Sequence, residues 1–298
     1  MAFRIADWFG YDADYRSPQS NEERDQHRCP FIESTCTKKL RDSTVSGVCS
    51  AFVGRGATES PVIICPNRLY ADTYSILQDT AAQAFGGNPT VITPDQLTTV
   101  EHDGTYVVAF GQRYGRELRL PARGIGRNFS IDWVLARISP HGVLAEFSAL
   151  EVQSIDTTGN YHRQLADLQA GRGPESKVTA NLNWENVNKR ILPQLIYKGH
   201  ALRREELCPK GLFFACPGIV YQHLLDRLGG TLEEYTPHRG SITFLRYGLG
   251  LPVEGMRPLL FEGASTTTAD QVALAFTAPR NLPPAGAYEN AIRAALGT

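Results

Sequence analysis

Three polar side chains near the middle of the chain could together bind a metal ion and orient a water molecule. Asp132 is flanked by Ile131 and Trp133, and Glu151 and Gln153 follow it in the alternating segment ALEVQS. Alternation of apolar and polar residues is typical of a β-strand with one polar face, so Glu151 and Gln153 should point the same way. A buried aspartate is costly without partners. The pattern predicts a functional site. Acids with a purely structural role, bound to the backbone or to arginines at a sheet edge, would give the same pattern.

Two carboxylates from neighbouring strands would form the oxygen site that Mg²⁺ requires when it also binds phosphate oxygens and water. Such an ion activates water and stabilises the charge that develops on a phosphate. Glu146 has the opposite parity to Glu151, so without a bulge only one of them can face the same partner as Asp132. Gln153 does not titrate and cannot be a general base. Its amide could position the water or hold a phosphate oxygen.

A second candidate site lies near the N-terminus, where four of the six cysteines gather: Cys29, Cys36, Cys49 and Cys65. The chain contains no CxxC pair among them. Disulfides are rare in the cytoplasm, and four thiolates suit zinc or iron, between which composition does not choose. Such an ion would stabilise a segment with few large apolar residues. The alternative is four unrelated buried thiols, as we expect for the two remaining cysteines.

Consecutive strands should position the acids. The apolar run TYVVAF at 105–110 predicts a buried strand, and NFSIDWVLARI at 128–138 and VLAEFSALEVQ at 143–153 predict a pair joined by the turn SPHG. The segment 181–204 looks partly helical. Further short strands are expected at 241–249, 257–263 and 271–278, followed by a short C-terminal helix.

Length and composition indicate a globular protein of one large domain or two smaller ones. The chain has 298 residues, of which 42% are hydrophobic and 20% charged. It has no long apolar run and no signal-peptide core, so we expect no membrane contact and a cytoplasmic location. The net charge of −1 is not the basic excess that usually indicates nucleic-acid binding, although five arginines cluster between Arg113 and Arg127. A solvated arginine-rich hairpin would give the same cluster.

In their order along the chain, these segments resemble the NotI family of type II restriction endonucleases, a branch of the PD-(D/E)xK nucleases. The resemblance runs from about residue 29 to 225 through RCPF, SGVC, ICPNRLY, GRELRL, FSIDWVLA, LEVQSIDTTGNYH and NVNKRILPQLIYK. It implies an α/β (α+β) fold, with a restriction-endonuclease-like mixed sheet flanked by helices and an N-terminal four-cysteine metal module. The expected units are residues 1–75 for the module and 76–298 for nuclease activity and DNA recognition.

The resemblance also implies roles for single residues. Asp132 and Glu151 take the places of the family's Mg²⁺-binding acids, and Gln153 stands where most of the superfamily has a lysine. Glu117 resembles an additional active-site acid. The four cysteines resemble those that hold one structural iron in the family, which is the reason to prefer iron over zinc.

The implied activity is Mg²⁺-dependent cleavage of both strands of DNA, leaving a 5′-phosphate and a 3′-hydroxyl. The expected partners are a second copy of the chain, double-stranded DNA with a short GC-rich palindrome such as CGGCCG, and a methyltransferase that protects the same site. There are two alternative interpretations. One is a DNA-binding or regulatory protein with this fold that does not cleave DNA, and the other is a repair-type nuclease that does not require a palindromic site. The candidate DNA contacts are Arg123, Arg127, Asn160, Tyr161, His162, Lys189 and Arg190.

Overall fold

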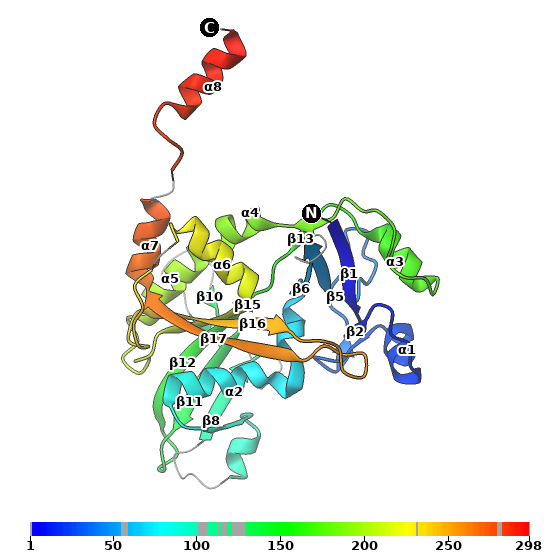
Figure 1. Cartoon of the computed structure of the whole chain (residues 1–298). Helices are drawn as coiled ribbons and strands as arrows, with labels where there is room; N and C mark the ends of the chain where they lie inside the picture. Colours follow the sequence, from blue (N-terminus) through cyan, green and yellow to red (C-terminus); the bar gives the residue numbers. More distant parts are fainter. Residues whose placement is uncertain are drawn as a thin grey trace.

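A seven-stranded mixed sheet lies at the centre of the molecule, with helices on both faces (Figure 1). Its strand order is β17-β16-β15-β12-β11-β8-β7, in which β12, β15 and β16 run parallel to one another, as do β7 and β8. The structure is a computed structural model that describes residues 2–54, 59–100, 106–112, 114, 118–120, 129–230, 232–278 and 282–297.

The strands of the central sheet are β7 (Thr90–Ile92), β8 (Tyr106–Gly111), β11 (Trp133–Ile138), β12 (Leu144–Val152), β15 (Leu212–Pro217), β16 (Ser241–Leu249) and β17 (Leu259–Thr268). The remaining strands are β1 (Ala2–Trp8), β2 (Tyr11–Asp12), β3 (Arg28–Cys29), β4 (Ser34–Thr35), β5 (Val48–Gly54), β6 (Ser60–Ile63), β9 (Arg119–Leu120), β10 (Phe129–Ser130), β13 (Thr157–Thr158) and β14 (Asn181–Leu182). The α-helices are α1 (Pro18–Asp25), α2 (Ala71–Phe85), α3 (His162–Gln169), α4 (Trp184–Asn186), α5 (Leu192–Leu202), α6 (Gly218–Arg227), α7 (Ala269–Thr277) and α8 (Ala287–Leu296). Two 3₁₀ turns, η2 (Pro66–Tyr70) and η3 (Gln96–Thr98), and a π-helical turn, η4 (Val187–Ile191), complete the set.

The alternation of β12 divides its side chains between two hydrophobic clusters, as the sequence pattern predicts. Leu150 and Val152 pack with Ile76 of α2 on one face of the sheet. Ala149 belongs to the cluster on the other face, which contains Leu195 of α5. Because side chains alternate along a strand, Glu151 shares the face of Ala149 and points toward the α5 side. The predicted strands at β8, β12, β16 and β17 and the C-terminal helix are confirmed.

Two element predictions are wrong. The segment 128–138 is not one strand, because β10 ends at Ser130 and the chain bends at Asp132 before β11 begins. The apolar segment 271–278 is not a strand, because helix α7 already starts at Ala269. The hydroxyl of Thr268 accepts a hydrogen bond from the backbone of Gln271, and this N-cap starts the helix directly after β17.

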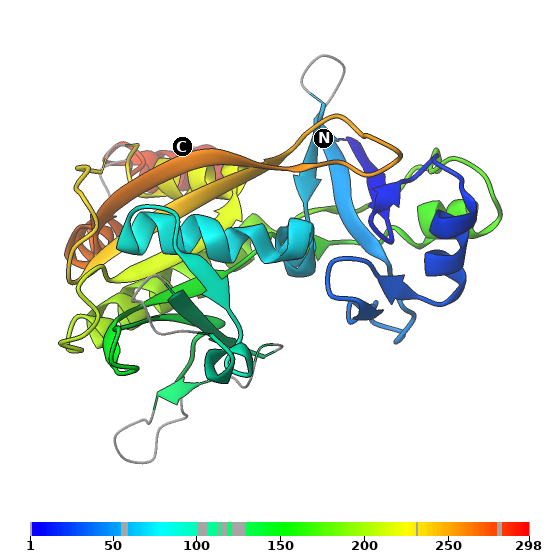
Figure 2. The same cartoon turned by 90° about the horizontal axis from the view of Figure 1, so that it is seen from below.

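The N-terminal residues form a second, four-stranded sheet with the order β2-β1-β5-β6. The hairpin of β16 and β17 extends toward it (Figure 2). An isolated bridge joins Tyr11 of β2 to Met256, which lies in the connection between β16 and β17. The expected boundary at residue 75 falls inside helix α2, which leads from this region into the central sheet.

At the other end of the chain, α8 lies apart from the body (Figure 1). None of the helices in the described part of the chain is long and apolar enough to cross a membrane.

Candidate active site

The two candidate acids lie close together at one end of β11 and β12. These strands are antiparallel, with Trp133 opposite Leu150, so Asp132 comes just before this pair on one strand and Glu151 just after it on the other. The backbone N–H of Val152 donates a 2.8 Å hydrogen bond to Oδ2 of Asp132. The acids are thus held together by the sheet's own geometry.

Asp132 is exposed, which corrects the expectation that it lies buried within a strand. Ile131 and Trp133 on either side of it are buried, but they belong to different hydrophobic clusters. The two neighbours of Asp132 therefore turn away from each other, and the bend between them directs the carboxylate out of the core. A carboxylate that remains accessible to solvent is one that a metal ion can reach.

Glu151 is much less accessible, and its surroundings change its acidity. Its side chain is 13% exposed. Burial raises the pKa of Glu151 to about 7, and the neighbouring Asp132 carboxylate raises it further, while Lys198 and a hydrogen bond from the backbone of Asp132 oppose the rise. Perturbed carboxylates of this kind are typical of functional sites.

Lys198 is the partner that the sequence did not reveal. Its Nζ lies 2.5 Å from Oε1 of Glu151, although 47 residues separate the two along the chain. Lys198 is on α5, whose buried face also carries Leu195 and Leu202. One signal was present: a lysine three residues after one buried leucine and four before another lies on the apolar stripe of a helix, where charge is unusual.

Two further polar residues lie on or next to β12, namely Glu146 and Gln153. Glu146 forms an ion pair with Arg137 on the facing strand, in agreement with its different parity from Glu151. Gln153 directly follows β12, its backbone N–H donates to the carbonyl of Ala215 at 3.0 Å, and its side chain is partly exposed. Gln153 therefore lies immediately after the strand that carries Glu151, whereas the carboxylate of Glu146 is paired with Arg137 across the strands.

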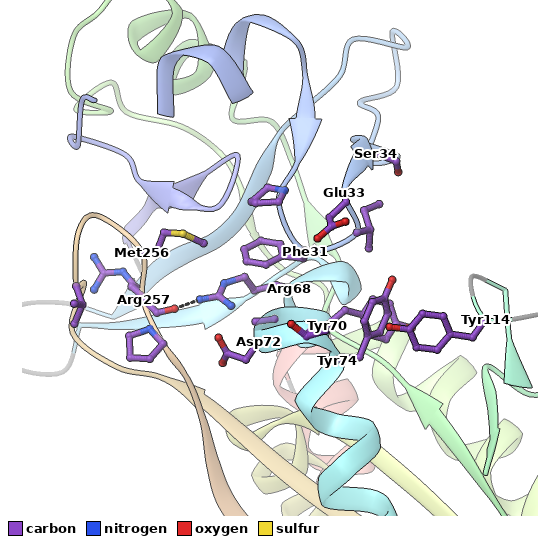
Figure 3. Close-up of a pocket in the computed structure, with 16 residues that line it drawn as sticks. Phe31, Glu33, Ser34, Arg68, Tyr70, Asp72, Tyr74, Tyr114, Met256 and Arg257 are labelled. Carbon is purple, nitrogen blue, oxygen red and sulfur yellow. Dashed lines mark hydrogen bonds between the residues drawn. The ribbon is translucent and has the colours of Figure 1, made fainter. Parts of the chain in front are cut away.

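A pocket of about 800 Å³ is lined by residues of the N-terminal region, of η2 and α2, and of the connection between β16 and β17 (Figure 3); neither Asp132 nor Glu151 lines it. Tyr70, Tyr74 and Tyr114 lie together on one side of it, with ring centroids 5.1 Å apart for the first pair and 5.0 Å for the second. Tyr70 accepts a 3.3 Å hydrogen bond from the indole of Trp133. Burial, and next the charge of Asp132, raises the pKa of Tyr70. The connection between this pocket and the acids therefore runs through Tyr70, which is close enough to Asp132 to feel its charge.

A comparison with family models identifies residues 15–206 with the restriction endonuclease NotI family, a match that covers more than half of the chain. The chain belongs to the NotI restriction endonuclease family. A search of curated proteins finds no match. Membership makes the protein a DNA-binding enzyme, a site-specific deoxyribonuclease of a restriction-modification system. Enzymes of this kind generally use Mg²⁺, and paired carboxylates such as Asp132 and Glu151 are ligands that suit it.

The four N-terminal cysteines of this NotI-family enzyme are all buried and none is in a disulfide. The pKa of Cys49 is raised, mainly by burial and next by Cys65 and Cys29, while the ammonium of Lys38 opposes the rise in the pKa of Cys65. The thiols are therefore near enough to influence one another.

The described part of the structure does not show the four-cysteine metal site that the sequence predicts. Within the described residues, no three or more His, Cys, Asp or Glu side chains converge in a group that could hold a metal ion. The donor set itself, four buried thiols without disulfides, has the chemistry of a soft-metal site. Cys208 and Cys216 are buried and free, as expected.

Three of the candidate DNA contacts follow β13. Asn160 is exposed, and its side chain accepts a 2.7 Å hydrogen bond from the backbone of His162. His162 is partly exposed, with Nδ1 3.7 Å from a carboxylate oxygen of Asp42. Tyr161 is only 3% exposed and its hydroxyl is hydrogen-bonded to Ser46 at 2.9 Å, so its ring supports the fold and is not available to DNA.

Lys189 and Arg190 are exposed in the π-helical turn η4. Lys189 forms a 2.6 Å ion pair with Glu185 one turn earlier. Glu117, Arg123 and Arg127 lie outside the described residues, so their expected roles stay predictions.

Proposed function

We propose that this enzyme is a type II restriction endonuclease with a PD-(D/E)xK core, which makes Mg²⁺-dependent double-strand cuts at a short GC-rich palindrome. The observation that carries the proposal is the proximity of Asp132 and Glu151 at the end of β11 and β12, where Val152 is hydrogen-bonded to the aspartate and the charge of Asp132 raises the pKa of Glu151. Two carboxylates in this arrangement suit a Mg²⁺ ion that also binds a phosphate.

The chain's own groups would prepare the reaction. Asp132 and Glu151 would hold the ion through their carboxylate oxygens. When bound, Mg²⁺ supplies a water of lowered pKa and neutralises charge on the phosphate. Gln153 would donate an amide hydrogen bond to the water or to a phosphate oxygen, which orients the group without taking its proton.

The proposed products are a 5′-phosphate and a 3′-hydroxyl. The oxygen of the attacking water bonds to phosphorus as the bond between phosphorus and the 3′ oxygen breaks. The leaving oxygen takes up a proton, and the water's proton passes to solvent. Glu117 is the proposed additional acid of the site, on the resemblance alone.

Recognition of a palindrome follows from symmetry if the enzyme acts as a homodimer, because a two-fold axis lets one surface read both half-sites. Guanine presents two acceptors in the major groove that suit arginine or lysine, and cytosine presents a donor that suits an acid. Asn160, His162, Lys189 and Arg190 are exposed or partly exposed polar groups that remain candidates for such contacts or for phosphates. A methyltransferase specific for the same palindrome would protect the host DNA.

For the N-terminal module we propose a structural iron ion held by Cys29, Cys36, Cys49 and Cys65. The support is the burial of all four thiols without disulfides. Elemental analysis of the purified chain should find about one iron per chain, since four thiolates suit a single ion. Zinc in the same amount would change the metal and keep the module; no bound metal would remove the proposal.

Digestion of a sequenced plasmid tests the proposed activity. With Mg²⁺, the enzyme should give discrete fragments whose ends map to one palindrome and carry 5′-phosphates. Fragments without a shared palindrome would favour the repair-type nuclease. Binding without cleavage, at any Mg²⁺ concentration, would favour the non-cleaving DNA-binding protein and refute the proposal.

A further inference from the structure

The strand that carries Glu151 provides no cation at the position of Gln153, yet a scissile phosphate gains negative charge as it is attacked. A positive side chain beside the acids would offset that charge. We propose that Lys198 of α5 is this group: a catalytic lysine that contacts the scissile phosphate from the helix, in place of one on the strand. The inference rests on the proposed nuclease function and adds a residue to its site.

The geometry places the ammonium of Lys198 at the acidic pair. Its Nζ is 2.5 Å from Oε1 of Glu151, and the two side chains are 11% and 13% exposed. In the described part of the chain, Glu151 is the acceptor that the structure gives this ammonium. An ammonium carries three N–H donors. One bond to Glu151 leaves donors for a phosphate oxygen entering from the open side, where Asp132 is exposed.

A purely structural role explains the position poorly. Replacing a buried ion pair by well-packed apolar groups is often neutral or stabilising, so stability alone gives little reason to keep one. The partner here is one of the two acids of the site and not a carboxylate elsewhere in the core. When both are ionised, the two acids carry two negative charges, and the lysine offsets one of them without blocking the exposed Asp132.

The packing of helix α5 holds Lys198 in a fixed position relative to the sheet. The π turn η4, which precedes α5, adds a residue to its turn and thereby sets the helix face that meets the sheet. Gly199, next to Lys198, packs against α7 so closely that an added Cβ would lie 2.9 Å from the Cβ of Ala269. The lysine is therefore held on a helix packed tightly between the sheet and α7.

Single-turnover cleavage of the plasmid mapped with the wild-type enzyme tests the inference. We expect Lys198→Met to reduce the rate at saturating Mg²⁺ by about 100-fold or more, the usual effect of removing one preorganised donor from a transition state. Lys198→Arg keeps the charge and should retain a rate within about tenfold of wild type. Lys177→Met, which neutralises an exposed lysine outside α5, is the matched control and should cut normally.

The Mg²⁺ dependence separates a catalytic lysine from one that only positions Glu151. Removing a positive charge beside the acids does not weaken cation binding, so Lys198→Met should need the same Mg²⁺ concentration for half-maximal rate, or a lower one. Its binding to the plasmid in Ca²⁺ should match that of wild type. Its melting temperature should fall, because Glu151 loses its buried partner, but the variant should remain folded at the assay temperature.

Three results would overturn the inference: a Lys198→Met rate within about threefold of wild type, full recovery of that rate at high Mg²⁺, or equal losses in the Met and Arg variants. If Lys198→Met does not fold, Lys198→Gln replaces it with the same expected loss. A wild-type enzyme that never cuts would instead refute the proposed function.

Discussion

The catalytic proposal depends on very few side chains, and so does the junction between the two sheets. Asp7 of β1 is fully buried and accepts hydrogen bonds from Ser50 at 2.7 Å and from Nε of Arg257 at 3.1 Å. Arg68 lies 3.9 Å from the same carboxylate. Arg257 comes from the connection between β16 and β17, so this ion network joins the N-terminal sheet to the central one.

Arg257→Met should destabilise the protein by about 3 kcal/mol, because the buried Asp7 carboxylate loses one of the positive charges that stabilise it. Urea denaturation measures the change. The double variant with Asp7→Asn should lose much less than the sum of the single variants, since both remove parts of one interaction. Strictly additive losses would contradict the coupling.

Among the elements, β12 and α5 carry Glu151 and Lys198 of the candidate site, and they differ in how well the sequence predicts them. The period of two along β12 correctly assigned Glu151 and Ala149 to one face, because alternation is a property of the strand alone. The contact with Lys198 was not predictable in this way, since it depends on which helix covers that face. The break at Asp132 was missed because the apolar residues on both sides resemble a continuous strand.

Gly199→Ala tests the packing of α5. The added methyl group would lie 2.9 Å from Ala269 and push α5 away from α7. We expect a loss of stability of about 1 kcal/mol, the cost of overpacking less the gain in helix propensity. Cleavage should fall as well, because Lys198 moves with the helix. Adding Ala269→Gly makes room for the methyl group and should restore both properties; a double variant no better than the single one would show that the contact does not limit α5.

The contact between α4 and α6 predicts a pH effect. His223 of α6 stacks on Trp184 with ring centroids 4.3 Å apart, and burial lowers its pKa. A histidine with a lowered pKa binds fewer protons in the folded state, so stability is present above its unfolded pKa and is lost as the pH falls through about 6.5. The melting temperature of wild type should therefore fall more steeply below that pH than that of His223→Phe. Parallel curves would contradict the assignment.

The whole molecule combines a seven-stranded mixed sheet with a smaller N-terminal sheet, and its sequence alone carries the resemblance to its family. The family could be predicted because the order of several short motifs can be read directly from the sequence. The strands of the sheet could be predicted because their apolar and alternating patterns are local. The cysteine site was less so: Cys29, Cys36, Cys49 and Cys65 are buried, which both the metal module and its alternative of unrelated buried thiols allow, and a converging metal group does not appear among the described residues. Spacing shows that thiols can meet, not that they do.

A homodimer is the form expected of an enzyme that reads a palindrome. Light scattering coupled to size-exclusion chromatography, with and without DNA bound in Ca²⁺, should give twice the mass of one chain for the protein component. A single chain bound per palindrome would contradict the symmetric model of recognition.

The central claim is that Asp132 and Glu151 are the acids of a metal-dependent nuclease site. Single-turnover cleavage by Asp132→Asn and Glu151→Gln, compared with Glu146→Gln, tests it most directly. The first two should lose at least about 1,000-fold in rate, equivalent to several kcal/mol of transition-state stabilisation, and still bind DNA in Ca²⁺. Glu146→Gln should cut normally, because its carboxylate pairs with Arg137. Normal cutting by either of the first two variants would contradict the account.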